Sequence, residues 1–177
     1  LIEEFCKTKP TIICGSTWQK DEALLNQFIK ENSQYNYIIA PHEMHHISQL
    51  QKQTGAQLFS TSNTENINSN NVLIIDSIGI LSSVYQYATI AYIGGGFGTG
   101  IHNILEATAF GLPIIFGPNY SKFKEAKELI ELEGAKSISN YIELAFAIDL
   151  LADFDQTIAT DYIKGNTGSS KTILATI

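Results

Sequence analysis

The sequence predicts an α/β domain built on a doubly wound, Rossmann-like parallel sheet. Short apolar runs alternate with helix-forming segments along nearly the whole chain, which is typical of βαβ units. The clearest unit is the stretch 89–119, where an apolar run, five glycines within seven residues, an amphipathic segment and a second apolar run follow one another. Because ligands of such sheets bind at the carboxyl ends of the strands, we expect a binding site at the glycine loop.

The predicted strands share a short apolar run that ends at a turn residue, as buried parallel strands do. In order, they lie at 11–14 before Gly15, 37–40 before Pro41, 57–60, 72–75 before Asp76, 90–93 before the glycines, 113–116 before Gly117, and 135–138. Residues 62–71 are rich in Asn and Ser without apolar periodicity, so we predict an exposed loop there.

The predicted helices share apolar residues spaced three and four apart, and several end at a glycine. In order, they lie at 21–31 with four apolar residues on one face, from Pro41 to about 53, at 80–87, at 102–110 before Gly111, at 122–133 before Gly134, and from a Ser or Asn cap at 139–140 to about 153. A further helix, a turn at 165–168 and a short terminal helix complete the prediction.

Composition limits the classes of function. The 177 residues suit one globular domain, with 44% hydrophobic and 16% charged residues. The net charge of −7 without a basic cluster argues against a nucleic-acid partner. Two cysteines indicate a reduced, cytoplasmic chain, and neither a signal peptide nor a run of membrane-helix length is evident. Because the chain begins with Leu1 and a predicted strand follows almost at once, we expect a piece of a larger protein.

Four loops at the carboxyl ends of the predicted strands carry polar and glycine residues. They are Gly15-Ser16-Thr17, Pro41-His42, Asp76-Ser77-Ile78-Gly79 and 94–103. Peptide N–H groups of a glycine loop beside a helix start can approach an anion closely, so we expect a phosphate or carboxylate there, plausibly from a nucleotide with a group attached. A tight turn that needs positive φ, or a plain helix cap at Ser16 and Thr17, is the alternative interpretation.

Two further side chains lie beside the glycine loop. His102 would start the predicted helix, and Glu106 would lie one turn later on the same face. We expect His102 to contact the ligand and Glu106 to accept hydrogen bonds from sugar hydroxyls. An ordinary first-turn histidine and a surface glutamate are the alternatives.

A second constellation belongs to a different class of function. His42-Glu43-Met44-His45-His46 matches H-E-x-x-H, in which His42 and His46 would bind zinc and Glu43 would act as general base. Pro41 places His42 in the first helical turn, and no third ligand follows at a recognisable spacing. A zinc hydrolase is therefore a remote alternative to solvated or loop-capping histidines.

The central stretch closely resembles the donor-domain signature of the 3-deoxy-D-manno-octulosonic acid (Kdo) transferases. The matching segments are 92–97, Gly100-Ile101-His102-Asn103-Ile104-Leu105-Glu106 and 111–118, together with 15–17, Ala40-Pro41 and 76–79. The resemblance covers about residues 11–150, in the right order.

This resemblance implies a GT-B glycosyltransferase with two Rossmann-like domains, of which residues 1–177 would be the C-terminal, donor-binding one. The full enzyme would use CMP-Kdo, invert the anomeric carbon and pass Kdo to the lipid A precursor in lipopolysaccharide biosynthesis, at the cytoplasmic face of the bacterial inner membrane. Its general base would be a glutamate of the N-terminal acceptor domain, so this chain would hold no catalytic residue and would be inactive alone. No cofactor or metal is implied.

The resemblance also assigns donor contacts by position. Ser16 and Thr17, with the amides of Gly94, Gly95 and Gly96, would hold the CMP phosphate and the Kdo carboxylate. Pro41, Ile78 and Gly79 would line the cytidine pocket, and Asn103 and Glu106 would hold ribose or phosphate-side groups.

This chain departs from the family at two positions. Many members carry Arg-His where this chain has His42-Glu43, and many carry a histidine where it has Trp18. A basic contact to the nucleotide would then be lost or supplied elsewhere. Another GT-B enzyme that uses a UDP-sugar, and a flavodoxin-like ligand-sensing module, remain as alternatives.

Overall fold

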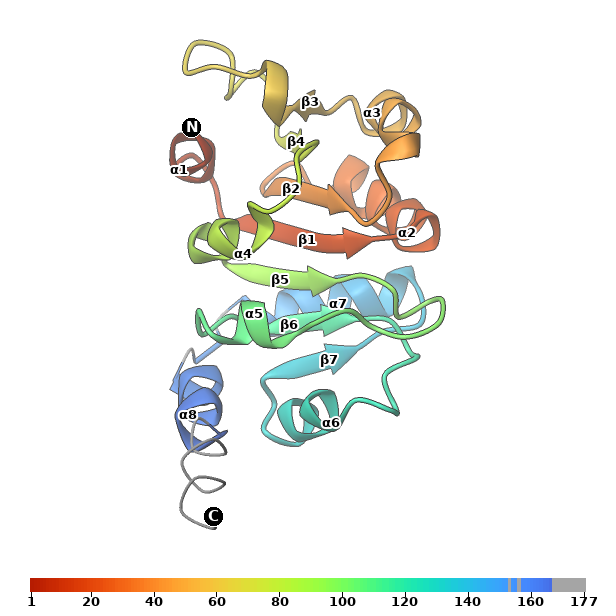
Figure 1. Ribbon diagram of the computed structural model, residues 1–177, viewed down its shortest axis with the longest axis vertical. Coiled ribbons are helices and arrows are strands. Elements are labelled where there is room, and N and C mark those ends of the chain that lie inside the picture. Colours follow the sequence, from red (N-terminus) through yellow and green to blue (C-terminus); the bar gives the residue numbers. More distant parts are fainter. Residues whose placement is uncertain (153, 156, 167–177) are drawn as a thin grey trace, which may run out of the picture.

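The predicted doubly wound α/β fold is confirmed by a computed structural model that describes residues 1–152, 154–155 and 157–166. Seven strands form one sheet in the order β3-β4-β2-β1-β5-β6-β7, and every neighbouring pair is parallel (Figure 1). The strands are β1 (Thr11–Thr17), β2 (Asn36–Pro41), β3 (Gln57–Leu58), β4 (Val72–Ile74), β5 (Ile90–Ile93), β6 (Ile114–Phe116) and β7 (Ala135–Ser137).

Helices cover both faces of this sheet. They are α1 (Ile2–Cys6), α2 (Gln19–Glu31), α3 (Ile47–Thr54), α4 (Leu81–Val84), α5 (Leu105–Thr108), α6 (Lys124–Glu131), α7 (Tyr141–Leu151) and α8 (Thr157–Asn166), with 3-10 turns at Met44–His46, Phe59–Thr61 and Tyr85–Tyr87. Among the described residues, no helix combines the length and the apolar character needed to cross a membrane.

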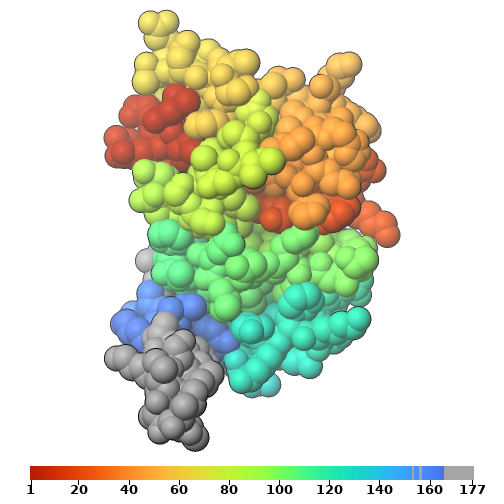
Figure 2. Space-filling view, viewed as in Figure 1, coloured from red at the N-terminus to blue at the C-terminus, as the bar shows by residue number. Residues whose placement is uncertain are grey.

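The core is divided by the sheet into two apolar clusters. One contains buried residues of α2, α3 and α7, such as Phe28, Leu50 and Leu144. The other contains buried residues of α1, α4, α5, α6 and α8, such as Val84 and Leu129. In the space-filling view the segments of α4, α5 and α6, coloured from yellow-green to teal, cover the sheet (Figure 2). Successive strand residues alternate between the two clusters, which is why the strands read as continuous apolar runs.

Three predicted helices are shorter than expected. The helix predicted from Pro41 begins only at Ile47, and the helix predicted at 80–87 covers Leu81–Val84 before a 3-10 turn. The helix predicted at 102–110 is wrong at both ends, because α5 covers only Leu105–Thr108. Ile101 and Ile104 are each 4% exposed and belong to one apolar cluster, although they precede the helix. The Asn103 side chain accepts a hydrogen bond from the Leu105 amide and so starts the helix late. His102 and Glu106 therefore do not share a helical face.

Both ends of the chain also differ from the prediction. The structure adds α1, whose Phe5 is fully buried against the sheet. Near the other end, Gly165 and Asn166 belong to α8 rather than to a turn, and the predicted terminal helix lies outside the described residues.

The sheet reverses its direction of growth at its centre. After β1, the chain forms β2, β3 and β4, which lie on one side of β1 in the spatial order β2-β4-β3. It then crosses to the other side of β1 and forms β5, β6 and β7. The loops that follow β1 and β5 consequently leave the sheet on either side of one crevice, the usual ligand position in such folds.

Candidate functional site

The end of β1 carries a non-glycine residue in the left-handed region. Ser16 has φ 53°, and the pairing of β1 with β2 is irregular between Gly15 and Thr17. Its side chain is half-buried and has no hydrogen-bond partner among the described residues. A conformation that costs about 1 kcal/mol or more is retained where the surroundings enforce it, and it occurs often at ligand sites. Ser16 thus presents an uncommitted hydroxyl beside the crevice.

Thr17 does not offer its hydroxyl to the crevice. Its side chain is fully buried, and its hydroxyl donates to Glu22 Oε1 at 3.0 Å. The expectation that the Thr17 side chain contacts a phosphate is therefore corrected, because this hydroxyl already serves to fix Glu22 on α2.

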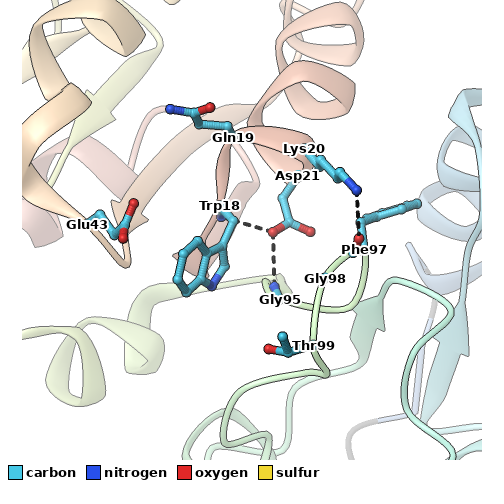
Figure 3. A pocket seen from close by; sticks show the side chains of 9 residues that line it. All are labelled: Trp18, Gln19, Lys20, Asp21, Glu43, Gly95, Phe97, Gly98 and Thr99. Atoms are coloured by element: carbon cyan, nitrogen blue, oxygen red, sulfur yellow. Dashed lines mark hydrogen bonds between the residues drawn. The ribbon is translucent and has the colours of Figure 1, made fainter.

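The glycine loop is locked to α2 by one buried carboxylate. Asp21 Oδ2 accepts hydrogen bonds from the amides of Gly95 and Trp18, both at 2.9 Å (Figure 3). Its Oδ1 accepts from the Tyr92 hydroxyl at 2.7 Å. Burial and the neighbouring Asp21 raise the pKa of Tyr92. Sequence reasoning did not single out Asp21, although an Asp at the third position of a helix is a recognisable capping signal.

The glycines of this loop are required by close approach of the backbone. A Cβ atom at Gly94 would lie 2.2 Å from the Ser16 carbonyl oxygen, and one at Gly96 would lie 2.6 Å from the Gly117 Cα. The Gly94 amide donates to Gly15 O at 2.9 Å, and the Gly95 amide is held by Asp21. The expectation that both amides bind an anion is therefore wrong in this arrangement; the Gly96 amide has no protein partner among the described residues.

A cavity of about 330 Å³ opens between the start of α2 and the glycine loop (Figure 3). It is lined by Trp18, Gln19, Lys20, Asp21, Glu43, Gly95, Phe97, Gly98 and Thr99. The Trp18 indole lies on one side of the Asp21 carboxylate and the Lys20 amine on the other (Figure 3). Lys20 Nζ lies 3.5 Å from Phe97 O. The sequence contains no arginine, so Lys20 is the permanently cationic side chain of this cavity.

Three rings from three different loops stack at the crevice. Trp18 follows β1 and stacks on His42, which follows β2, with ring centroids 4.6 Å apart. His42 in turn lies 4.4 Å from His102, which follows β5, and Trp18 Nε1 donates to His102 Nε2 at 2.9 Å. The two positions at which this chain departs from the Kdo transferase pattern, Trp18 and His42, are therefore in direct contact.

The Trp18–His102 hydrogen bond requires an unprotonated Nε2, and burial and His42 lower the pKa of His102. Trp18 is the single tryptophan, and a protonated imidazole in contact quenches indole fluorescence. We expect Trp18 emission to fall on acidification with a midpoint below about 6.5, the ordinary histidine value. Because the folded state binds this proton less readily than the unfolded chain, the free energy of unfolding should also decrease as the pH is lowered through that range.

The control for this titration is His102→Gln, whose amide can still accept from Trp18 but does not titrate. Fluorescence of the single tryptophan, followed between neutral and acidic pH, measures both chains. An identical transition in the two chains would contradict the assignment to His102.

The segment after the glycine loop gathers three polar groups. Glu106 accepts hydrogen bonds from the Ser82 hydroxyl at 2.6 Å and from Asn103 Nδ2 at 3.1 Å. A second hollow of about 330 Å³ is lined by His102, Asn103, Leu105 and Phe123 among others. The structure thus joins Asn103 to Glu106 and places His102 beside Asn103 in the lining of this hollow, without the helix that the sequence predicted.

The remaining predicted residues lie on neighbouring loops. Pro41 ends β2 and is buried, whereas Ile78 is 89% exposed and Gly79 has φ 92°. Within the described part of the chain, the buried hydroxyl of Ser77 has no hydrogen-bond partner. The Ser82–Glu106 hydrogen bond connects the loop of Ile78 and Gly79 to the Asn103 segment, since Ser82 follows that loop directly.

The helix needed for the H-E-x-x-H alternative does not form. His42 precedes the 3-10 turn Met44–His46, and its ring stacks on Trp18. His46 is buried and bonds to Glu22 through Nε2. His42 and His46 thus belong to different environments, and the zinc hydrolase site predicted from His42, Glu43 and His46 is not supported.

No family model matches the chain, whereas comparison with curated proteins finds relatives named 3-deoxy-D-manno-octulosonic acid transferase. The chain is 31% identical to the 3-deoxy-D-manno-octulosonic acid transferase of Aquifex aeolicus over 85% of its own length and 44% of the relative. It is 31% identical to the Rickettsia bellii protein of the same name over 86% of the chain and 38% of the relative. The chain therefore spans less than half the length of these curated relatives.

Solved structures support the fold assignment. The C-terminal CMP-Kdo binding domain of WaaA from Acinetobacter baumannii superposes with a TM-score of 0.73 at 19% identity, covering 91% of this chain and 92% of that one. A glycosyltransferase from Rickettsia africae superposes with a TM-score of 0.63 at 12% identity, covering 93% of this chain and 47% of that one. The resemblance seen in the glycine-loop motifs is thus matched by relatives along most of the chain.

Proposed function

We propose, on the premise that this chain is a relative of the Kdo transferases, that it is the donor-binding domain of a GT-B glycosyltransferase that moves Kdo from CMP-Kdo to a lipid A precursor. The main support for this proposal is the crevice at the switch point of the sheet. The loops that hold Ser16 and Gly96 follow the neighbouring strands β1 and β5 at the switch point, and Asn103 bonds to Glu106 in the segment after the second of these loops. This is the position at which doubly wound sheets bind nucleotides.

The proposed contacts use groups that keep hydrogen-bonding capacity. No described residue bonds to the Ser16 hydroxyl or the Gly96 amide, whereas Glu106 and Asn103 keep spare lone pairs and an N–H beside the bonds that they already make. Ser16 and the Gly96 amide offer hydrogen-bond donors to the CMP phosphate and the Kdo carboxylate. Glu106 and Asn103 offer acceptors and a donor to the ribose, and the exposed side chain of Ile78, with Pro41 and Gly79, offers an apolar wall to cytidine. His102, whose Nε2 is occupied by Trp18, retains Nδ1 for the donor.

Catalysis by the longer protein would then rest on orientation and charge stabilisation. Holding CMP-Kdo in one geometry removes much of the entropic barrier to attack by the acceptor hydroxyl. Donors aimed at the departing CMP phosphate stabilise the charge that develops there. The general base and the lipid A precursor site belong, in this proposal, to a second domain, and the enzyme acts at the cytoplasmic face of the bacterial inner membrane.

Nucleotide titration tests this proposal. We expect CMP to shift the amide resonances of 94–103 selectively, with weaker responses to UMP and UDP. Glu106→Gln should weaken CMP binding about 10- to 150-fold, because a charge-assisted hydrogen bond to a ribose hydroxyl contributes about 1.5–3 kcal/mol. Glu131→Gln, an exposed carboxylate on α6, is the matched control and should bind CMP as the unaltered chain does.

The same titration also tests the alternative that the chain belongs to an enzyme that uses a UDP-sugar. Equal or stronger responses to the uridine nucleotides would identify a UDP-sugar enzyme and overturn the CMP-Kdo assignment. Shifts that survive Glu106→Gln unchanged would place the nucleotide elsewhere on the chain.

A further inference from the structure

A buried histidine outside the crevice has one ring nitrogen without a partner. His46 is 8% exposed, and its Nε2 lies 2.8 and 3.0 Å from the two carboxylate oxygens of Glu22. Its Nδ1 is buried and bonds to no atom of the residues that the structure describes. When Nε2 donates to the carboxylate, Nδ1 is left as a lone-pair donor. A carboxylate that orients a histidine through one nitrogen while the other ligates an ion is the usual arrangement in metal sites.

Two further potential metal ligands, Glu43 and His45, lie beside this histidine. His45 Nδ1 lies 3.7 Å from Glu43 Oε2, and the rings of His45 and His46 have centroids 5.3 Å apart. One ligand atom from each of Glu43, His45 and His46 lies within 4.8 Å of the others. Glu43 directly precedes the 3-10 turn Met44–His46, so all three side chains come from one short segment.

We propose that Glu43, His45 and His46 form a binding site for a divalent transition-metal ion of the Zn²⁺ type, with Glu22 as the positioning residue. Two imidazoles and one carboxylate are ligands that Zn²⁺ accepts, with water in the remaining position. This ligand set differs from the H-E-x-x-H reading of the sequence, because His45 replaces His42.

The site has a structural consequence for the proposed donor cavity. Glu43 lines that cavity, and Glu22, which orients His46, is itself held by Thr17 at the end of β1. An ion bound to Glu43 and His46 would tie the cavity residue Glu43 to His46, which Glu22 already holds against α2. In this proposal the ion has a structural role at the rim of the cavity.

The experiment uses the metal alone. The chain is stripped with a chelator, and Zn²⁺ is titrated by calorimetry while Co²⁺ is followed by its visible absorption in a four-coordinate site. We expect one equivalent to bind, and His45→Ala or Glu43→Gln to remove saturable binding. Glu22→Gln should retain the stoichiometry but lower affinity about 10- to 100-fold, the effect of losing a residue that orients a ligand.

His42→Gln is the matched control, since it alters the adjacent histidine and leaves the proposed ligand set intact. It should bind one equivalent with unchanged affinity. Loss of binding in His42→Gln with retention in His45→Ala would overturn the assignment in favour of the H-E-x-x-H set. Absence of saturable binding in the unaltered chain, or equal binding in His45→Ala, would overturn the site itself. Circular dichroism of each variant separates lost ligands from lost folding.

Discussion

Asp21→Ala should lower the free energy of unfolding by on the order of 3 kcal/mol or more, because it leaves three donors without their acceptor. These donors are the amides of Trp18 and Gly95 and the hydroxyl of Tyr92, and Asp21 is fully buried among them. Each buried donor left unsatisfied costs about 1–3 kcal/mol. The loss should appear in urea unfolding as a lower midpoint with an unchanged slope.

Asp21→Asn is the matched control for this effect. Its carboxamide oxygen can accept from both amides, while its NH₂ group donates to the Tyr92 oxygen, so the same network closes with reversed polarity at one bond. We expect a loss of about 1 kcal/mol, the net value of an ordinary hydrogen bond. If alanine and asparagine destabilise the chain equally, the network does not hold the glycine loop as described.

Gly94→Ala should destabilise the chain by roughly 3 kcal/mol, at the upper end of overpacking costs. The added Cβ would lie 2.2 Å from the Ser16 carbonyl oxygen and 2.6 Å from the Thr17 Cα. Both are backbone atoms, so no rotamer change relieves the contact, and β1 and β5 must separate at the crevice. CMP binding should weaken together with stability, as measured by urea unfolding and by the nucleotide titration.

Gly98→Ala tests whether this effect belongs to the position or to the loop. Its Cβ would lie 3.4 Å from Gly95 O, and Gly98 is exposed without a left-handed φ. Stability should stay within about 0.5 kcal/mol of the unaltered chain, as for most surface substitutions. A large loss at Gly98, or none at Gly94, would contradict the close approach at the switch point.

The strands were predictable because both of their faces are buried. Runs such as 72–75 and 90–93 contain no residue that suits an exposed face, and the structure places a strand in each of them. The segment 101–104 was not predictable in the same way. Ile101 and Ile104 are three residues apart, a spacing that suits a helix. Both side chains are buried, but the segment to which they belong is not helical.

Much of the candidate site could not be predicted from the linear sequence. Ser16, Asn103 and Glu106 could be selected from a resemblance, but the stack of Trp18, His42 and His102 joins three loops that only the strand order brings together. Asp21 has a local signal as a helix cap, whereas its bond to Gly95 depends on the pairing of β1 with β5.

The position of β1 at the centre of the sheet also determines when the crevice can exist. β1 pairs with β5 through contacts such as Ile12 with Ile90, so every residue between these two strands must be made before they can meet. Closing so long a loop carries an entropic cost before any pairing offsets it. On the ribosome, a nascent chain that has not extended beyond β5 therefore has no switch point and cannot yet hold a nucleotide there.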